Sequence, residues 1–313
     1  MEKKNTAPLK PQKIRFSSKE VKRQWPLLVW ALGFFIYGIV FNYIPLAGWV
    51  MAFQNYKPKT GLFHSKWIGL EKFKFLFSDK NFILDIRNTL AMGILNLVAT
   101  FVMAILFAIL LNELKSKGGK RVVQTISYLP HFLSWIIVTG ILHDALSSSG
   151  IVNELLGYLG RTPINFFAEP KYFWGIVAFA NVWKETGWNA IIYLAAITSI
   201  DPNLYEAAEI DGAGRWGKIR HITLPSLRPT IMILLLMNIG WVLNAGFEVQ
   251  YILGNGLVKR VSETIDIYTL TWGISQNDYS LGTAAGIFRS AVSIALILIS
   301  NYVARKTGDD KLF

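Results

Sequence analysis

The sequence predicts an all-α integral membrane protein with about six transmembrane helices. Of its 313 residues, 52% are hydrophobic, and the mean hydropathy is positive. The hydrophobic residues are concentrated in six stretches, each long enough, or nearly so, to cross roughly 30 Å of hydrocarbon as a helix. The stretches cover residues 26–44, 90–111, 122–142, 172–200, 230–244 and 284–304. One such stretch is also compatible with a buried core helix, but six together favour a membrane protein.

The first stretch is expected to remain as a membrane anchor. Residues 1–23 are too long and too polar for the leader of a signal peptide, and no small-residue cleavage site follows the apolar run. Orientation follows from the basic residues near the span ends, because Lys and Arg are concentrated in cytoplasmic loops. These residues fall on one side of a six-span chain: Lys19, Lys22, Arg23; Lys115, Lys117, Lys120, Arg121; Arg215, Lys218, Arg220, Arg228; Arg305 and Lys306. Both termini are therefore expected in the cytoplasm.

Composition divides the chain into three parts and excludes some functions. We expect a basic cytoplasmic segment at 1–24, a transmembrane domain at 25–304 and a cytoplasmic tail at 305–313. The net charge of +12 is more typical of loops beside anionic lipid than of nucleic-acid binding. With zero cysteines there is no disulfide, thiolate metal site or cysteine nucleophile. His131, and His143 with Asp144, have poor spacing for a metal or a proton relay, and no fourth ligand follows them.

The loop at residues 201–229, expected in the cytoplasm, is not built as a passive connector. Asp201 can cap a helix that begins at Pro202, and Gly212 and Gly214 can end or turn it. A second short helix over 215–223 would precede a break at Pro225. Small alanines and an exposed carboxylate suit docking into a groove of a soluble partner. The alternative from physics alone is an interfacial helix that lies on the bilayer surface.

Within this loop, EAAEIDGAGRWGKIRHITLPSL resembles the EAA loop of permease subunits of binding-protein-dependent ABC importers. The motif positions fall on Glu206, Ala207, Ala208, Asp211, Gly212, Gly214, Ile222, Leu224 and Pro225. In that family the loop forms coupling helices that insert into a cleft of the ATPase subunit. The resemblance implies that Glu206 pairs with a basic residue there and that Gly214 provides the turn between two short helices.

The resemblance extends along most of the chain from Trp25 onward. WIGLEKFKFLFSD and RNTL look like the first external loop of carbohydrate-uptake permeases. The basic N-terminal segment and PLAGWVMAFQNYKP are most similar to the subgroup for oligosaccharides and polysaccharide fragments. This implies a non-catalytic translocation subunit of the cell membrane that works with a second homologous permease as a heterodimer, with two ATPase subunits and with an extracytoplasmic sugar-binding protein. No G-x-x-x-x-G-K-[ST] loop is present, so ATP and Mg are expected on the ATPase subunits, with no cofactor bound by this chain.

Ionisable residues inside the fourth span are the first candidates for the substrate path. Lys184 and Glu185 are costly in a membrane, and amides and aromatic rings flank them. Such a mixture binds sugars, but inter-subunit ion pairing or helix packing also explains it. Counting back from Glu206, resemblance to the maltose permease places sugar contacts at Asn181, Trp183, Lys184 and Glu185, and Trp188 adds a further ring. The relative is uncharged at 184 and 185, which could favour a charged or larger saccharide.

The fifth span supplies a possible second wall. Asn238, Trp241, Asn244 and Glu248 are at helical spacing on a similar face, although Asn can equally hold helices together. Two other functions compete: an ion-coupled secondary transporter that uses Lys184 and Glu185, and a membrane enzyme that uses His143 and Asp144. Neither accounts for the EAA-like loop, and no convincing internal repeat supports a secondary transporter.

Overall fold

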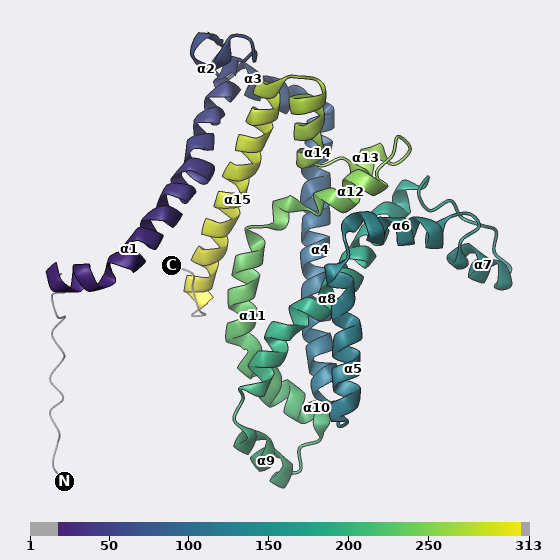
Figure 1. Ribbon diagram of the computed structural model, residues 1–313. Helices are drawn as coiled ribbons and strands as arrows, with labels where there is room; N and C mark the ends of the chain where they lie inside the picture. The colour runs from purple at the N-terminus through teal and green to yellow at the C-terminus, as the bar shows by residue number, and fades with distance from the viewer. Residues whose placement is uncertain (1–17, 308–313) are drawn as a thin grey trace. The chain divides into compact units, whose positions relative to one another are not determined.

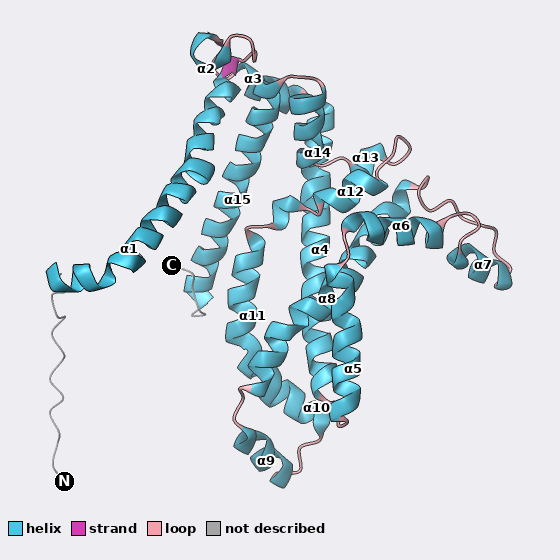
Figure 2. Cartoon of the chain, viewed as in Figure 1, coloured by secondary structure: helices cyan, strands magenta, loops and turns pink. Residues whose placement is uncertain are grey.

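The computed structural model describes residues 18–307. It confirms an all-α architecture in which the strands are two short pairs of residues (Figure 2). The described chain forms two units, residues 18–50 and 51–307. Residues 1–17 of the expected N-terminal segment and residues 308–313 of the expected tail lie outside the described residues.

The first unit is one long apolar helical segment. It contains α1 (Ser18–Gly38), a π-helical turn (Ile39–Tyr43) and the start of a 3-10 segment (Ile44–Phe53) that continues into the second unit. Side chains such as Trp30 and Phe34 are 70% and 73% exposed. Residues 22–53 are long and apolar enough to cross a membrane, in agreement with the first predicted span.

Two long helices form the frame of the second unit, α4 (Lys80–Asn112) and α8 (Pro170–Thr198). They lie side by side over much of their length (Figure 1). Asp79 caps α4 by accepting from the backbone amide of Asn81 at 2.9 Å. Small residues such as Ala104 and Ala108 on α4 let the helix approach Tyr193 on α8, and all three are buried.

A small hairpin precedes this frame. Strands β1 (Gln54–Asn55) and β2 (Lys66–Trp67) pair antiparallel and enclose α2 (Gly61–His64); α3 (Glu71–Ser78) follows. Ser280 fastens the hairpin to the last helix, α15 (Tyr279–Thr307), because its hydroxyl donates to the Gln54 carbonyl at 2.5 Å and accepts from the Tyr56 amide at 2.9 Å.

The predicted continuous helix at 122–142 is wrong. Helix α5 (Lys117–Tyr128) ends before a 3-10 turn (Leu129–Phe132), and α6 (Trp135–Leu146) starts after the cap residue Ser134; α7 (Ile151–Tyr158) follows. The backbone leaves the helical conformation at Leu133 and Ser134, which are extended at ψ 140° and 153°, shortly after Pro130, which has no amide to donate to the preceding turn. We call residues 129–134 the His131 turn.

A second interruption separates α11 (Leu224–Ile239) from α12 (Phe247–Leu253). Between them lie a 3-10 turn (Val242–Asn244) and two residues in the left-handed region, Ala245 at φ 42° and Gly246 at φ 77°. We call residues 240–246 the Ala245 turn. Helices α13 (Lys259–Ser262) and α14 (Ile265–Leu270) and a π-helical turn (Thr271–Ser275) then lead to α15.

The break expected at Pro225 is also wrong. Helix α10 (Arg215–Lys218) continues through a π-helical turn (Ile219–Thr223) into α11, in which Leu224 donates to the Ile219 carbonyl. Pro225 therefore lies inside one continuous helical segment, directly after the π-helical turn, and local π adjustments of this kind allow a helix to accommodate a proline. The preceding helix α9 (Pro202–Ile210) lies with α10 at one end of the second unit (Figure 1).

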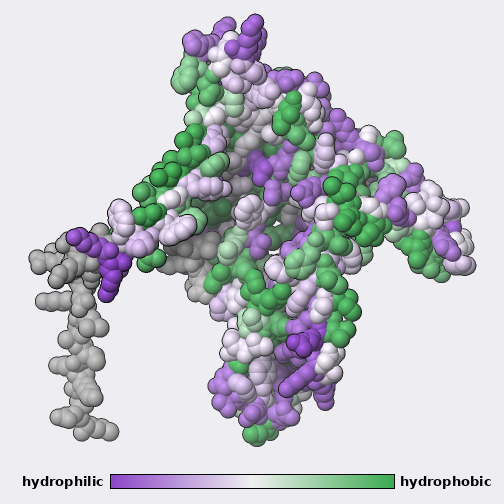
Figure 3. Space-filling view, viewed as in Figure 1, coloured by the Kyte–Doolittle hydropathy of each residue, from purple (hydrophilic) through white to green (hydrophobic). Residues whose placement is uncertain are grey.

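Within residues 18–307, five helical stretches are long and apolar enough to span a membrane: residues 22–53, 80–112, 135–158, 215–239 and 279–306. The predicted span at 172–200 is present as α8, which is about 44 Å long but is not among these five. In Figure 3, hydrophilic side chains gather over α9 and α10, and hydrophobic ones cover the elements above them.

Candidate functional site

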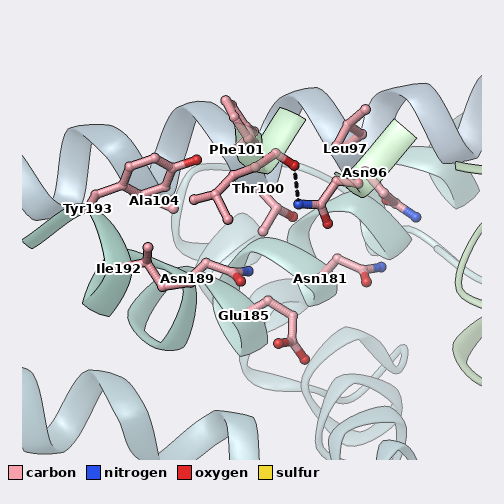
Figure 4. A pocket seen from close by; sticks show the side chains of 12 residues that line it. Asn96, Leu97, Thr100, Phe101, Ala104, Asn181, Glu185, Asn189, Ile192 and Tyr193 are labelled. Atoms are coloured by element: carbon pink, nitrogen blue, oxygen red, sulfur yellow. Dashed lines mark hydrogen bonds between the residues drawn. The ribbon is translucent and has the colours of Figure 1, made fainter. Parts of the chain in front are cut away.

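A polar cavity lies between α4, α8 and α11. It has a volume of about 690 Å³ including its open mouth. The polar lining comprises four carboxamides, one carboxylate and two hydroxyl groups: Asn96, Asn181, Asn189, Asn238, Glu185, Thr100 and Tyr193. Leu97, Phe101, Ala104, Ile192 and Leu234 complete the wall (Figure 4).

Helical periodicity places these groups in the cavity. Asn181, Glu185 and Asn189 are four residues apart on α8 and form one stripe, because residues at that spacing share a helix face. Asn96 and Thr100 form the matching stripe on α4, and Figure 4 shows the two stripes facing each other.

Two of the carboxamides, Asn181 and Asn238, donate hydrogen bonds within their own helices. Asn181 Nδ2 donates to the Val177 carbonyl at 2.9 Å, and Asn238 Nδ2 donates to the Leu234 carbonyl at 2.7 Å. The side-chain oxygens are then the groups left for a ligand that carries hydroxyl donors. Asn96 Oδ1 is buried without a protein partner among the described residues, and a ligand or water would satisfy it.

Three of the residues predicted for the substrate path line this cavity: Asn181, Glu185 and Asn238. Lys184 does not. Its side chain is buried and donates from Nζ to the His131 carbonyl at 2.5 Å, away from the cavity. Trp188 stacks on the His131 ring with 4.4 Å between centroids, and Trp183 is 40% exposed outside the lining.

The proposed second wall is not formed by one helix face. Helix α11 ends at Ile239, and the left-handed residues of the Ala245 turn intervene, so Asn238 is separated from Asn244 and Glu248. Asn244 Oδ1 accepts from Arg289 Nη2 at 3.1 Å, while Trp241 and Glu248 are exposed. The spacing argument failed because it assumed a helix through Gly240 and Gly246.

Three polar lining residues were missed from the sequence: Asn96, Thr100 and Tyr193. Asn189 is among the amides that flank Lys184 and Glu185 in the sequence, and its four-residue spacing from Glu185 places it on the same helix face. For Asn96 and Thr100 the signal was absent, since nothing in the sequence shows that α4 packs along α8.

The Ala245 turn contacts one residue of this site, Asn96. The Ala245 carbonyl accepts from Asn96 Nδ2 at 3.4 Å and also from Gln250 Nε2. Gly93 on α4 lets the turn approach, because a Cβ there would lie 2.0 Å from the Val242 carbonyl oxygen. A cavity residue, Asn96, is therefore also a support of the turn.

The EAA-like loop presents a separate exposed surface. Asp201 caps α9 by accepting from the Asn203 amide at 3.0 Å, as predicted. Gly212, at φ 77°, ends the helix, and the Ala213 amide donates back to the Ala208 carbonyl at 2.8 Å. Gly214 lies in the turn between the two short helices as the extended cap residue before α10, and the left-handed residue of that turn is Gly212.

An ion pair joins the two short helices. Lys218 Nζ donates to Glu209 Oε2 at 2.7 Å, and this hydrogen bond, with the lysine charge, lowers the pKa of Glu209. Tyr205 and Thr223 also share a hydrogen bond at 3.0 Å. Glu206 is exposed, as are Ile210 and Trp216 nearby. The loop thus offers a carboxylate beside apolar side chains.

Comparison with known proteins identifies the family. Residues 100–309 match the family described as "Binding-protein-dependent transport system inner membrane component". The chain belongs to this family. As an inner membrane component with several apolar helices, it is a multi-pass membrane protein.

Two similar proteins and one solved structure align with most of the length of this chain. The "Polygalacturonan/rhamnogalacturonan transport system permease protein YteP" of Bacillus subtilis (strain 168) is 42% identical, with 89% of this chain and 87% of the relative covered. "Protein LplB" of the same organism is 40% identical, with 89% and 88% covered. A chain in the crystal structure of a bacterial alginate ABC transporter with an alginate pentasaccharide-bound periplasmic protein matches at TM-score 0.87 and 39% identity, with 94% and 99% covered.

Proposed function

We propose that this chain is the permease subunit of an ABC importer that moves oligosaccharides or polysaccharide fragments across the cytoplasmic membrane, driven by ATP hydrolysis on separate subunits. The cavity of carboxamides between apolar helices carries the proposal, in a member of a transport family. Relatives named for polygalacturonan and rhamnogalacturonan, and a similar structure named for alginate, support a saccharide substrate.

The chemistry of the lining suits a sugar. Side-chain amides both donate to and accept from hydroxyl groups. Phe101 meets the buried Tyr193 edge to face at 5.8 Å and, being half-buried itself, offers ring surface for the C–H faces of a saccharide. The lining residues include no Lys or Arg, and Lys184 points elsewhere, so this cavity supports recognition through hydroxyl groups rather than through a substrate carboxylate.

The same proposal covers the EAA-like loop and the partners. Glu206, Ala207, Ala208, Asp211, Gly212, Gly214, Leu224 and Pro225 belong to the surface that docks on an ATPase subunit. Two such subunits hold ATP and Mg, a second homologous permease completes the path, and a sugar-binding protein delivers substrate. Both termini are then cytoplasmic, with the transmembrane domain at 25–304 and the loop at 201–229 on the cytoplasmic side.

Purification followed by transport tests this function. The tagged chain, extracted with its partners in mild detergent, is expected to co-purify with an ATPase, and the complex in proteoliposomes should accumulate labelled oligogalacturonides only with ATP and the binding protein. Uptake that needs an ion gradient and no ATP would instead establish the secondary transporter, and a lone chain without an ATPase would contradict the importer.

A further inference from the structure

The His131 turn leaves a backbone carbonyl that α5 and α6 do not satisfy. Extended backbone at Leu133 and Ser134 separates α5 from α6, and the end of α5 that leads into the turn meets the middle of α8, where Gly187 lies next to Ser127. An unpaired carbonyl is expensive inside a membrane because no bulk water is available. Lys184 Nζ donates to the His131 carbonyl at 2.5 Å, so a charged side chain of α8 satisfies the interruption.

Side chains of α8 pack closely against this turn. At Gly187, an added Cβ would lie 2.1 Å from the Ser127 carbonyl oxygen, so the glycine allows a close approach of the end of α5, directly before the turn. Trp188 stacks on His131 with an interplanar angle of 1°, and Phe132 packs edge-on against the same indole at 5.6 Å. Trp135 lies 5.5 Å from Lys184 Nζ, on the far side of the turn.

Glu185 contacts the His131 turn and also lines the cavity. Its Oε2 lies 2.8 Å from His131 Nδ1, and its Oε1 lies 3.5 Å from Lys184 Nζ. Burying the lysine is tolerable because the carboxylate offsets its charge. The same carboxylate lines the cavity with Asn181 and Asn189, so a hydroxyl donor bound there competes with His131 for its oxygens.

We propose that Lys184 and Glu185 are positioning residues that hold the His131 turn on α8, and that Glu185 makes this packing respond to a hydroxyl-bearing ligand in the cavity. The holding role follows from the contacts alone. The response to ligand rests on the proposed function. A saccharide hydroxyl that donates to Glu185 weakens the His131 contact, which loosens the turn from α8.

Distance measurements on the purified complex test both roles. The chain has no cysteine, so spin labels can be placed at Leu129→Cys on the turn and Thr198→Cys at the end of α8. The complex that carries the unchanged chain, labelled in the same way, gives the background from partner subunits. Without ligand, Lys184→Met is expected to broaden the distance distribution, because an unpinned turn samples more than one packing.

Lys171→Met is the matched control. This lysine is on α8 too, but its ion pair with Glu169 is exposed, so the distribution should stay unchanged. Lys184→Arg, which keeps the charge and the donors, should restore a narrow distribution. A distribution in Lys184→Met equal to that of the unchanged protein would overturn the holding role. If Lys184→Met does not assemble, Glu185→Gln provides the same comparison: broadening supports the role and no change refutes it.

Addition of a mixture of oligogalacturonides, or of malto-oligosaccharides as a second probe, tests the response. At least one mixture should shift the distribution in the unchanged complex, and the shift should be lost in Glu185→Gln. An equal shift in Glu185→Gln refutes the link through Glu185. Failure of sugar transport in proteoliposomes would remove the proposed function while the ligand-free broadening by Lys184→Met remained, so the two failures are distinguishable.

Discussion

The two turns that interrupt helices, the His131 turn and the Ala245 turn, are held by different kinds of side chain. The His131 turn is fastened to α8 by Lys184 and Glu185, whereas the Ala245 turn is fastened to α4 by the amide of Asn96, with Gln250 donating to the same carbonyl. A glycine also allows a close backbone approach near each turn: Gly93 faces the Val242 carbonyl of the Ala245 turn, and Gly187 faces the Ser127 carbonyl at the end of α5, just before the His131 turn. Charged groups hold strongly but depend on one another, since removing one leaves the other uncompensated. Neutral amides hold weakly and independently.

The largest expected effect comes from breaking the charged support. Lys184→Met should lower the free energy of unfolding by about 3 kcal/mol, because Glu185 then loses its buried counter-charge. Asn96→Leu at the other turn removes one neutral hydrogen bond and should cost about 1 kcal/mol. Denaturant titration of the purified complex in detergent measures both variants. Equal losses would mean that the distinction between charged and neutral supports has no energetic basis.

The next largest effects are expected at the two glycines that allow close backbone approach, Gly187 and Gly93. Gly187→Ala and Gly93→Ala should each destabilise by about 1–3 kcal/mol, since the new methyl group meets a backbone carbonyl that cannot rotate away. Gly175→Ala is the control on α8, because a Cβ there meets nothing within 4 Å, and it should be neutral or stabilise by about 0.5–1 kcal/mol. The same titration ranks the three variants, and a harmless Gly187→Ala would contradict the close approach.

A smaller effect is expected at the left-handed residue of the Ala245 turn. Ala245→Gly relieves the strain of a positive φ but loses a buried methyl group, so its stability should change by less than about 0.5 kcal/mol. Ala178→Gly in the regular part of α8 has no strain to relieve and should cost about 1 kcal/mol. Thermal unfolding of both variants makes the comparison, and a large loss in Ala245→Gly would argue against the strained backbone.

The smallest effect on stability is expected at the exposed turn between α9 and α10, where the ion pair of Glu209 and Lys218 is open to water. The pKa of Glu209 is lowered by Lys218, so this pair stabilises the loop above the pKa of the unfolded glutamate, and the contribution disappears as pH falls through the lower folded pKa. Hydrogen exchange of residues 202–218, corrected for intrinsic rates, should therefore speed up in acid. Lys218→Met should remove most of that pH dependence, and an unchanged dependence would assign it to another group.

The sequence predicted features that depend on local chemistry. Apolar stretches such as 90–111 and 284–304 lie within the membrane-spanning helices α4 and α15, and Asp201 and Gly212 marked the ends of α9, because caps and hydrophobic length act within a few residues. Features that depend on contacts between distant segments were missed or wrong. Lys184 was assigned to the substrate path, yet its partner His131 is on a turn whose packing no local pattern reveals. Asn96 was missed for the same reason.

Gly187 also limits how this protein can vary. The atom that a larger residue would strike is the carbonyl oxygen of Ser127, which every amino acid carries. No substitution at position 127 can therefore compensate for a bulkier residue at 187, in contrast to a clash between two side chains, where one can shrink as the other grows. Suppressors of a Gly187 variant are instead expected at positions that displace the whole of α5 from α8, so that recovery requires a shift of backbone rather than an exchange of side chains.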